Sequence, residues 1–174
     1  MDDLRVVVAK PLASEYVERL RSADPRVEVS YEPDLMPPMR WPSDHRGDPS
    51  FKRTPEQQAR LAELVDSADI LYSFPNNNSA ELARIVRANP KLKWVHIMAA
   101  GGGSHVKAAN LTKDELRRVI FTTSAGVHAG TLAEFALFGV LAGAKELPRL
   151  QADKQRHYWP TSRRTMGMVS DMTV

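Results

Sequence analysis

The stretch Leu92-Lys-Trp-Val-His-Ile-Met-Ala-Ala-Gly-Gly-Gly-Ser-His-Val106 decides how the fold of this chain is interpreted. It opens with an apolar run, residues 94–98, whose aromatic and β-branched side chains favour a strand. Three successive glycines, Gly101–Gly103, then suit a turn with unusual backbone dihedral angles that leaves amides bare. Ligands of open α/β sheets bind at the carboxyl ends of the strands, so we interpret this turn as a loop that binds an anion or a carboxylate. A plain turn is the competing interpretation, because turns use glycine whatever their function.

The glycine turn does not match the dinucleotide-binding fingerprint. Gly101 and Gly103 have the first spacing of Gly-x-Gly-x-x-Gly, but the third glycine position holds Val106. The acidic residue expected about twenty residues further on is also missing, since the sequence there reads Ile120-Phe-Thr122. The turn therefore suits a small anion better than a pyrophosphate.

Composition excludes several classes of protein. The 174 residues, 43% of them hydrophobic and 26% charged, are typical of a soluble domain with a sizeable core. No run is long enough to span a membrane and no signal peptide opens the chain, so a cytoplasmic location is expected. Cysteine is absent, and the five histidines lack metal-ligand spacing, so no metal site is predicted. The net charge of +3 is scattered, which gives no reason to expect nucleic acid or membrane as a partner.

Strand and helix patterns alternate through the first two thirds of the chain. Helices are predicted to start at Ser14, at the capping box Thr54-Pro-Glu-Gln57, at Asn78 and at the capping box Thr112-Lys-Asp-Glu115. This alternation predicts a flavodoxin-like, doubly wound parallel α/β domain over residues 1–125. The five strand patterns cover residues 4–9, 27–31, 70–74, 94–98 and 119–123.

Residues 32–53 form a different kind of segment. Five prolines exclude a regular helix, and loops of this length are usually functional or disordered. Two interpretations stand for it. In one, Arg40, Trp41 and His45 form a wall or lid over a ligand; in the other, the segment is a surface loop pinned by Trp41 and Phe51.

A long apolar helix is predicted over residues 131–147, opened by the capping box Thr131-Leu-Ala-Glu134. Between Leu132 and Ala144 the only charge is that of Glu134. A helix that is apolar on every side has to be buried on every side, so another domain or subunit should cover it. We therefore expect a homodimer that forms through this helix.

Two stretches resemble the D-isomer-specific 2-hydroxyacid dehydrogenases. Lys91-Leu-Lys-Trp-Val-His-Ile-Met-Ala-Ala-Gly101 resembles that family's strand and glycine loop. Gly126-Val-His-Ala-Gly-Thr-Leu-Ala-Glu-Phe-Ala-Leu137 resembles its interdomain loop and the start of its connecting helix. The resemblance covers nearly the whole chain, but nothing is carried over to residues 32–53. It implies the substrate-binding part of a two-domain enzyme that interconverts 2-oxo acids and D-2-hydroxy acids with NAD or NADP.

The resemblance also implies roles for individual residues. The amides of Ala100, Gly101 and Gly102 would bind the substrate carboxylate, while His128 and Leu132 would face the cofactor cleft; a satisfied loop histidine is the alternative for His128. In the family, the cofactor fingerprint and the catalytic Arg, Glu and His follow a turn like that at residues 170–174. We therefore interpret residues 126–174 as the interdomain loop, the connecting helix and the lead-in to a Rossmann domain that this chain lacks. No catalytic residue is assigned, and the isolated chain is expected to be inactive and to bind no dinucleotide.

Other classes of protein fit less well. A stand-alone flavodoxin-like module that binds a small anion would use the same glycine loop, but it would have to cover helix 131–147 on its own sheet. A response-regulator-like switch needs acidic residues where the sequence has Lys10-Pro11 and a phosphoacceptor where it has Pro75-Asn76. A hydrolase is disfavoured because no Gly-x-Ser-x-Gly elbow is present. The sequence leaves open which oxo acid is bound and whether the cofactor is NAD or NADP.

Overall fold

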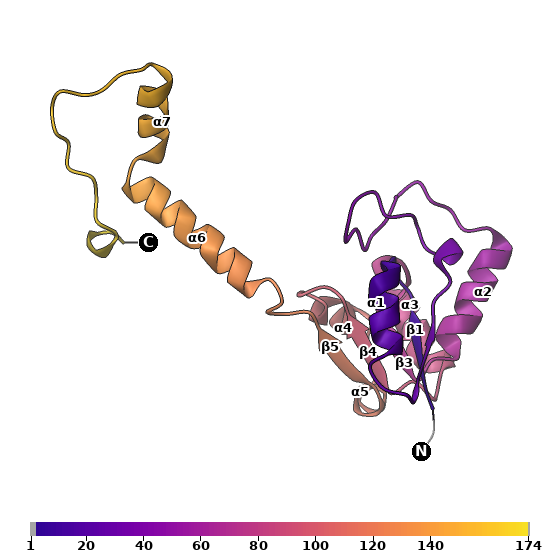
Figure 1. The fold of residues 1–174 in the computed structure, drawn as a ribbon. Helices are drawn as coiled ribbons and strands as arrows, with labels where there is room; N and C mark the ends of the chain where they lie inside the picture. Colours follow the sequence, from indigo (N-terminus) through magenta and orange to yellow (C-terminus); the bar gives the residue numbers. More distant parts are fainter. Residues whose placement is uncertain (1–2, 174) are drawn as a thin grey trace. The chain divides into compact units, whose positions relative to one another are not determined.

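A computed structural model describes residues 3–173, and its central feature is a parallel sheet (Figure 1). The strand order is β2-β1-β3-β4-β5, and every pairing is parallel. This is the order of a flavodoxin-like, doubly wound sheet, so the predicted fold class is confirmed. The strands are β1 (Leu4–Val8), β2 (Val27–Ser30), β3 (Ile70–Tyr72), β4 (Trp94–Ile97) and β5 (Ile120–Thr123).

One face of the sheet carries most of the core. Side chains alternate between the two faces of a strand, and Val7, Leu71 and Val95 point to this face. They pack against the apolar sides of α2 (Pro55–Asp66) and α3 (Ser79–Ala88). The apolar side chains that these two helices bury there are Leu61, Leu64, Val65, Leu82, Ile85 and Val86.

The opposite face is less completely covered. Val6, Val8 and Val29 pack there against Val17 of α1 (Ser14–Arg21), above β1 and β2. Towards the β5 edge the same face presents exposed apolar side chains on β4 and β5. Two short helices, α4 (Gly103–Ala108) and α5 (Lys113–Arg118), connect β4 to β5.

Local hydrogen bonds start the helices where the sequence predicts. Thr54 Oγ1 accepts from the Gln57 amide at 3.2 Å, and Gln57 Oε1 accepts from the Thr54 amide at 2.9 Å, which completes the capping box of α2. The capping box of Thr112 and Glu115 at α5 is complete in the same way. Asn78 caps α3 by accepting from two amides of its first turn. These side chains satisfy amides that a helix start leaves without partners.

The proline-rich segment has one 3-10 turn, η1 (Pro33–Leu35), and no other helix or strand before α2. Asp44 holds it together from inside, because its buried carboxylate accepts from the Arg40 guanidinium at 2.7 Å and from the Gly47 amide at 3.2 Å. Trp41 does not pin the loop, as one interpretation predicted: its side chain is 56% exposed and lies under Arg40. The side chains that anchor the segment in the core are those of Leu35 and Met36.

The contacts divide the chain into two compact units, the first ending at Ala125 and the second starting at Gly126. The second unit contains α6 (Ala129–Ala144), α7 (Leu147–Gln155) and a 3-10 turn, η3 (Val169–Asp171). The predicted bounds of 131–147 for the long helix are wrong. His128 takes the N-cap position, so Thr131 lies inside the first turn and forms no capping box. Glu146 adopts a left-handed backbone, with φ of 50°, which separates α6 from α7.

Helix α6 is apolar on every side, as the sequence predicts, and its own unit covers little of it. It contacts α7 and η3, and Ala144 at its end is buried. Phe135 is 74% exposed, and large apolar side chains elsewhere on the helix are exposed as well. A row of this kind is unusual on a monomeric surface. Its members are Leu132, Phe135, Leu137, Phe138 and Leu141.

Candidate functional site

The glycine loop follows β4 at the carboxyl edge of the sheet. Ala100 and Gly101 are exposed, and the amides of both donate no hydrogen bond within residues 3–173. The Gly102 amide differs, because it donates to the Ala99 carbonyl at 3.2 Å. Two of the three amides that the resemblance assigns to a carboxylate therefore have no acceptor among the described residues.

The backbone of this loop is ordinary, contrary to the expectation of unusual dihedral angles. None of Gly101, Gly102 and Gly103 has a positive φ. Glycine is needed at position 102 for a different reason: a Cβ there would lie 2.7 Å from Ile97 Cγ2 and 3.0 Å from Thr123 Cγ2. A Cβ at Gly101 or Gly103 would meet no atom within 4 Å. Gly102 thus lets the loop lie close to β4 and β5, while its two neighbours are sterically free.

His96 on β4 is engaged through both ring nitrogens. Thr122 Oγ1 accepts from Trp94 Nε1 at 2.8 Å and lies at hydrogen-bond distance, 2.9 Å, from His96 Nδ1. His96 Nε2 lies at hydrogen-bond distance, 3.2 Å, from Ser124 Oγ. Burial lowers the pKa of His96 below its usual value, which favours the neutral ring. His96 links β4 to β5 and has no free ring nitrogen to offer a ligand.

His128 and Leu132 lie in the second unit, whereas Ala100, Gly101 and Gly102 lie in the first. The His128 carbonyl accepts from the Leu132 amide at 3.0 Å in the first turn of α6. The His128 side chain caps no amide, and the Leu132 side chain is exposed. Both side chains are therefore available to a ligand or to another protein surface.

A cavity of about 370 Å³ lies between the loops that follow β1 and β3. These strands are neighbours in the sheet, but their following helices pack on opposite faces, α1 on one and α3 on the other. Two neighbouring strands whose following helices lie on opposite faces form a topological switch point. A crevice opens at such a point, at the carboxyl edge of a doubly wound sheet. Its lining includes residues 9–11 and 76–77 from the two loops and residues 37, 46, 48, 49, 51 and 53 from the proline-rich segment.

The lining of this cavity is cationic. Lys10 is only 7% exposed, yet its ammonium makes no hydrogen bond or ion pair within the described residues. Burial, together with the charges of Arg53 and Arg46, lowers the pKa of Lys10 to about 8. Arg46 is exposed and has no acidic partner within residues 3–173. The one carboxylate of the lining, Asp48, already accepts from the Ser50 amide and hydroxyl.

No local pattern of the sequence predicts this cavity. Lys10 and Asn76 stand out in the sequence only as departures from the response-regulator pattern. Their positions directly after two strands were a usable signal, because the carboxyl ends of neighbouring parallel strands meet at one edge. Arg46 and Arg53 carried no such signal, since no repeating pattern places residues of an irregular loop.

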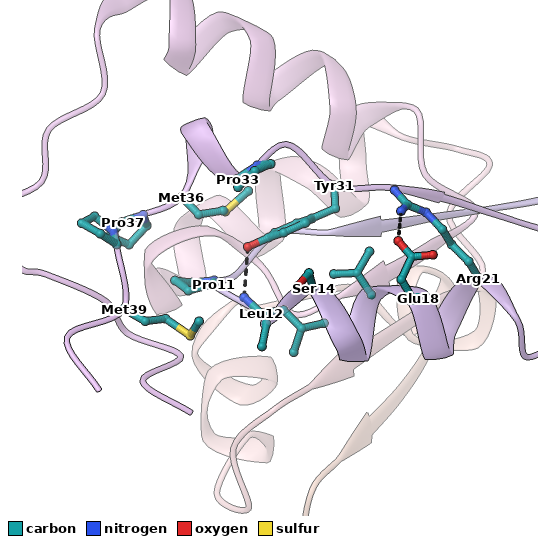
Figure 2. Close-up of a pocket in the computed structure, with 13 residues that line it drawn as sticks. Pro11, Leu12, Ser14, Glu18, Arg21, Tyr31, Pro33, Met36, Pro37 and Met39 are labelled. Carbon is teal, nitrogen blue, oxygen red and sulfur yellow. Dashed lines mark hydrogen bonds and ion pairs between the residues drawn. The ribbon is translucent and has the colours of Figure 1, made fainter. Parts of the chain in front are cut away.

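A second cavity in the first unit, about 570 Å³ in volume, lies beside α1 and is largely apolar (Figure 2). Its two charged side chains pair with each other, as Arg21 donates to Glu18. The Tyr31 hydroxyl accepts from the Leu12 amide at 3.1 Å. The polar groups drawn here are thus largely satisfied within the protein, unlike those around Lys10.

Two features are absent from the part of the chain that the structure describes, a cluster of metal ligands and a helix that could span a membrane. Residues 3–173 hold no group of three or more His, Asp or Glu side chains arranged to bind a metal ion. Among the described helices, none combines the length and the apolar character that crossing a bilayer demands.

Comparisons with known proteins show which solved structure has a similar fold. No family model matches the sequence, and no curated protein matches it either. The structure is similar to a crystal structure of a D-isomer specific 2-hydroxyacid dehydrogenase family protein from Aeromonas salmonicida subsp. salmonicida, at 16% sequence identity and a TM-score of 0.55. The match covers 94% of this chain and 43% of that one. This chain therefore has the fold of part of such a dehydrogenase, spanning less than half of its length.

Proposed function

We propose that the first unit is the substrate-binding part of an NAD(P)-dependent oxidoreductase that interconverts 2-oxo acids and D-2-hydroxy acids. The observation that carries this proposal is that the adjacent amides of Ala100 and Gly101, at the carboxyl end of β4, donate no hydrogen bond to any described residue. The fold supports it, because part of a dehydrogenase of this class has the same architecture.

The chemistry of the loop suits a carboxylate. Two adjacent N–H donors without acceptors can donate to the two oxygens of one carboxylate, and hydrogen bonds to an ionised acceptor are stronger than neutral ones. Both donors are exposed, so water competes for them and the affinity of this loop alone is weak. We expect a dissociation constant of about 1–10 mM for a simple 2-hydroxy acid.

The described residues do not fit a dinucleotide cofactor. The position where the fingerprint needs its third glycine is Val106, whose side chain packs against the core and blocks a close approach. The helix that follows the glycine loop, α4, has only six residues. We therefore propose that NAD or NADP is held outside these residues, and we assign no hydride-transfer step to them.

The second unit has a proposed role of its own. We propose that residues 126–174 lead from the substrate domain towards a nucleotide-binding domain and that α6 pairs with a second copy of the chain. The exposed apolar row on α6 supports an association through this helix. In this proposal, His128 and Leu132 would face the cofactor cleft.

A different function, a stand-alone module that binds small anions, is the second candidate. The observation that favours it is the cationic cavity, which is built entirely from the first unit. Such a module needs neither a cofactor nor a second domain.

The test follows amide resonances of the isotope-labelled chain during titration with D-lactate and with lactamide, which lacks the carboxylate. The Ala100 and Gly101 resonances should shift with lactate and stay in place with lactamide. Oxidation of NADH and NADPH by a panel of 2-oxo acids, measured on the same preparation, tests for turnover. Equal shifts with both compounds would overturn the assignment of the loop.

A further inference from the structure

The cavity between the β1 and β3 loops contains a charge arrangement that the glycine loop does not explain. Lys10, Arg46 and Arg53 face it with three positive charges, and Asp48 supplies one negative charge. Among the described residues of the first unit, the other buried charged side chain is Asp44, which pairs with Arg40, whereas Lys10 pairs with no carboxylate of these residues. A lysine whose side chain is largely buried beside two guanidinium groups, with no carboxylate bound to it, is electrostatically unfavourable, so a ligand that supplies negative charge would stabilise the site.

Neutral donors complete the cavity. Asn76 Oδ1 accepts from Arg53 Nη1 at 3.4 Å, which leaves the amide hydrogens of the Asn76 side chain to donate elsewhere. Asn77 lines the same wall, and both asparagines adopt left-handed backbones with φ of 58° and 50°. Arg53 is itself held in place, because its Nε donates to the Leu35 carbonyl at 2.6 Å. A buried cation, two arginines and two amides thus converge on one space.

We propose that this cavity binds a small organic acid through a doubly negative oxyanion, either a phosphate monoester or a dicarboxylate. Net charge supports this class, because three cations and one carboxylate leave an excess of two positive charges. Volume supports it too, since about 370 Å³ accommodates the oxyanion with a short carbon skeleton. The inference deepens the second candidate function, because it names the class of anion that the cavity would take. It is independent of the first candidate, because it involves different loops and holds whether or not the glycine loop binds an oxo acid.

The experiment titrates the 174-residue chain with inorganic phosphate, malonate and acetate at constant ionic strength. Calorimetry gives the affinities, and amide resonances of residues 10, 76 and 77 report the location. We expect phosphate or malonate to bind at least about tenfold more tightly than acetate. The tighter of the two identifies the class: phosphate indicates a phosphate monoester and malonate a dicarboxylate.

Three variants separate the cavity from general surface charge. Lys10→Met and Arg46→Gln each remove one cation of the lining, and Lys52→Met removes an exposed cation of the same loop that does not line the cavity. The first two should weaken dianion binding about tenfold or more, and Lys52→Met less than twofold. Arg46 is exposed, so its variant still tests the site if Lys10→Met fails to fold.

Two results would overturn the inference. One is acetate binding as tightly as both dianions, and the other is equal weakening by all three variants. Failure of lactate to shift Ala100 and Gly101 would count against the proposed function alone, because those residues do not line the cavity.

Discussion

Arg53 Nη1 donates to Asn76 Oδ1 at 3.4 Å, and this bond joins the end of the proline-rich segment to the loop after β3. The same guanidinium donates through Nε to the Leu35 carbonyl at 2.6 Å. One side chain thus connects two parts of the long segment to the switch point of the sheet. The shape of the cationic cavity depends on this connection.

Replacing Arg53 by lysine should loosen the long segment although the charge is kept. An ammonium lacks the planar set of donors that reaches Leu35 and Asn76 together, so about 1–2 kcal/mol of hydrogen bonding is lost locally. Hydrogen exchange of residues 36–53 should become faster. Arg46→Lys is the matched control, because the Arg46 guanidinium donates no hydrogen bond to another described residue. If hydrogen exchange of residues 36–53 is unchanged in both variants, Arg53 does not hold the segment in place.

The charge on Lys10 should make both ligand binding and stability depend on pH. Burial and the nearby arginines lower the pKa of Lys10 to about 8 from the ordinary 10.5, whereas hydrogen bonds from Ser50 lower the pKa of Asp48, the carboxylate of the lining. At pH values between about 8 and 10.5, Lys10 is protonated in the unfolded chain and has lost its proton in the folded chain. The free energy of unfolding should therefore rise with pH across this range. Dianion affinity should instead fall, by about tenfold from about pH 7.5 to about pH 9.5.

Calorimetric titration with inorganic phosphate and urea unfolding at the same pH values measure these two effects. Phosphate is already mostly dianionic at the lower pH, so its own titration does not dominate the change. Lys10→Met should flatten both profiles, whereas a variant that retains the full pH dependence would assign it to another group.

The substitution Gly102→Ala adds a methyl group to the glycine loop and should destabilise the first unit. The Cβ would approach Ile97 Cγ2 to 2.7 Å and Ile97 Cβ to 2.9 Å, and overpacking of this kind costs about 1–3 kcal/mol. Gly101→Ala is the control, since its Cβ meets nothing within 4 Å, and we expect a change within about 0.5 kcal/mol. Urea unfolding of both variants checks this difference; similar free energies of unfolding would show that the close approach is unimportant.

Removing the cap of α2 should have a moderate effect. Thr54→Ala deletes the oxygen that accepts from the Gln57 amide, so the free energy of unfolding should fall by about 1 kcal/mol. Thr54→Ser keeps the oxygen and should retain most of the stability. If serine is as harmful as alanine, the methyl group of Thr54 matters more than the cap.

Self-association should depend on the apolar row of α6. Phe135 and Phe138 stand with ring centroids 6.3 Å apart and are both exposed. Sedimentation equilibrium should show the parent chain associating with rising concentration, whereas the variant with Phe135→Glu and Phe138→Glu should stay near 19.4 kDa. Gln151→Glu adds a negative charge at an exposed position of α7, away from Phe135 and Phe138 in the sequence, and should associate like the parent.

The local elements of the first unit followed directly from the sequence. Thr54 and Thr112 cap helices where predicted, because a capping box is formed by residues three positions apart. The order of strands and helices followed from hydrophobic periodicity, which is also local. The bounds of α6 were missed by a few residues at each end, since neither the N-cap at His128 nor the left-handed Glu146 has a distinctive residue type.

Local sequence patterns alone predict the alternation of strands and helices and, through it, the flavodoxin-like sheet. The close approach of Gly102 to Ile97 and the burial of Lys10 beside Arg53 and Asn76 become visible only in the folded chain. The reason is physical: helices and strands arise from neighbours in the chain, whereas the cavity joins residues more than forty positions apart. Their encounter depends on the switch point between β1 and β3 and on the path of an irregular loop, which no local pattern specifies.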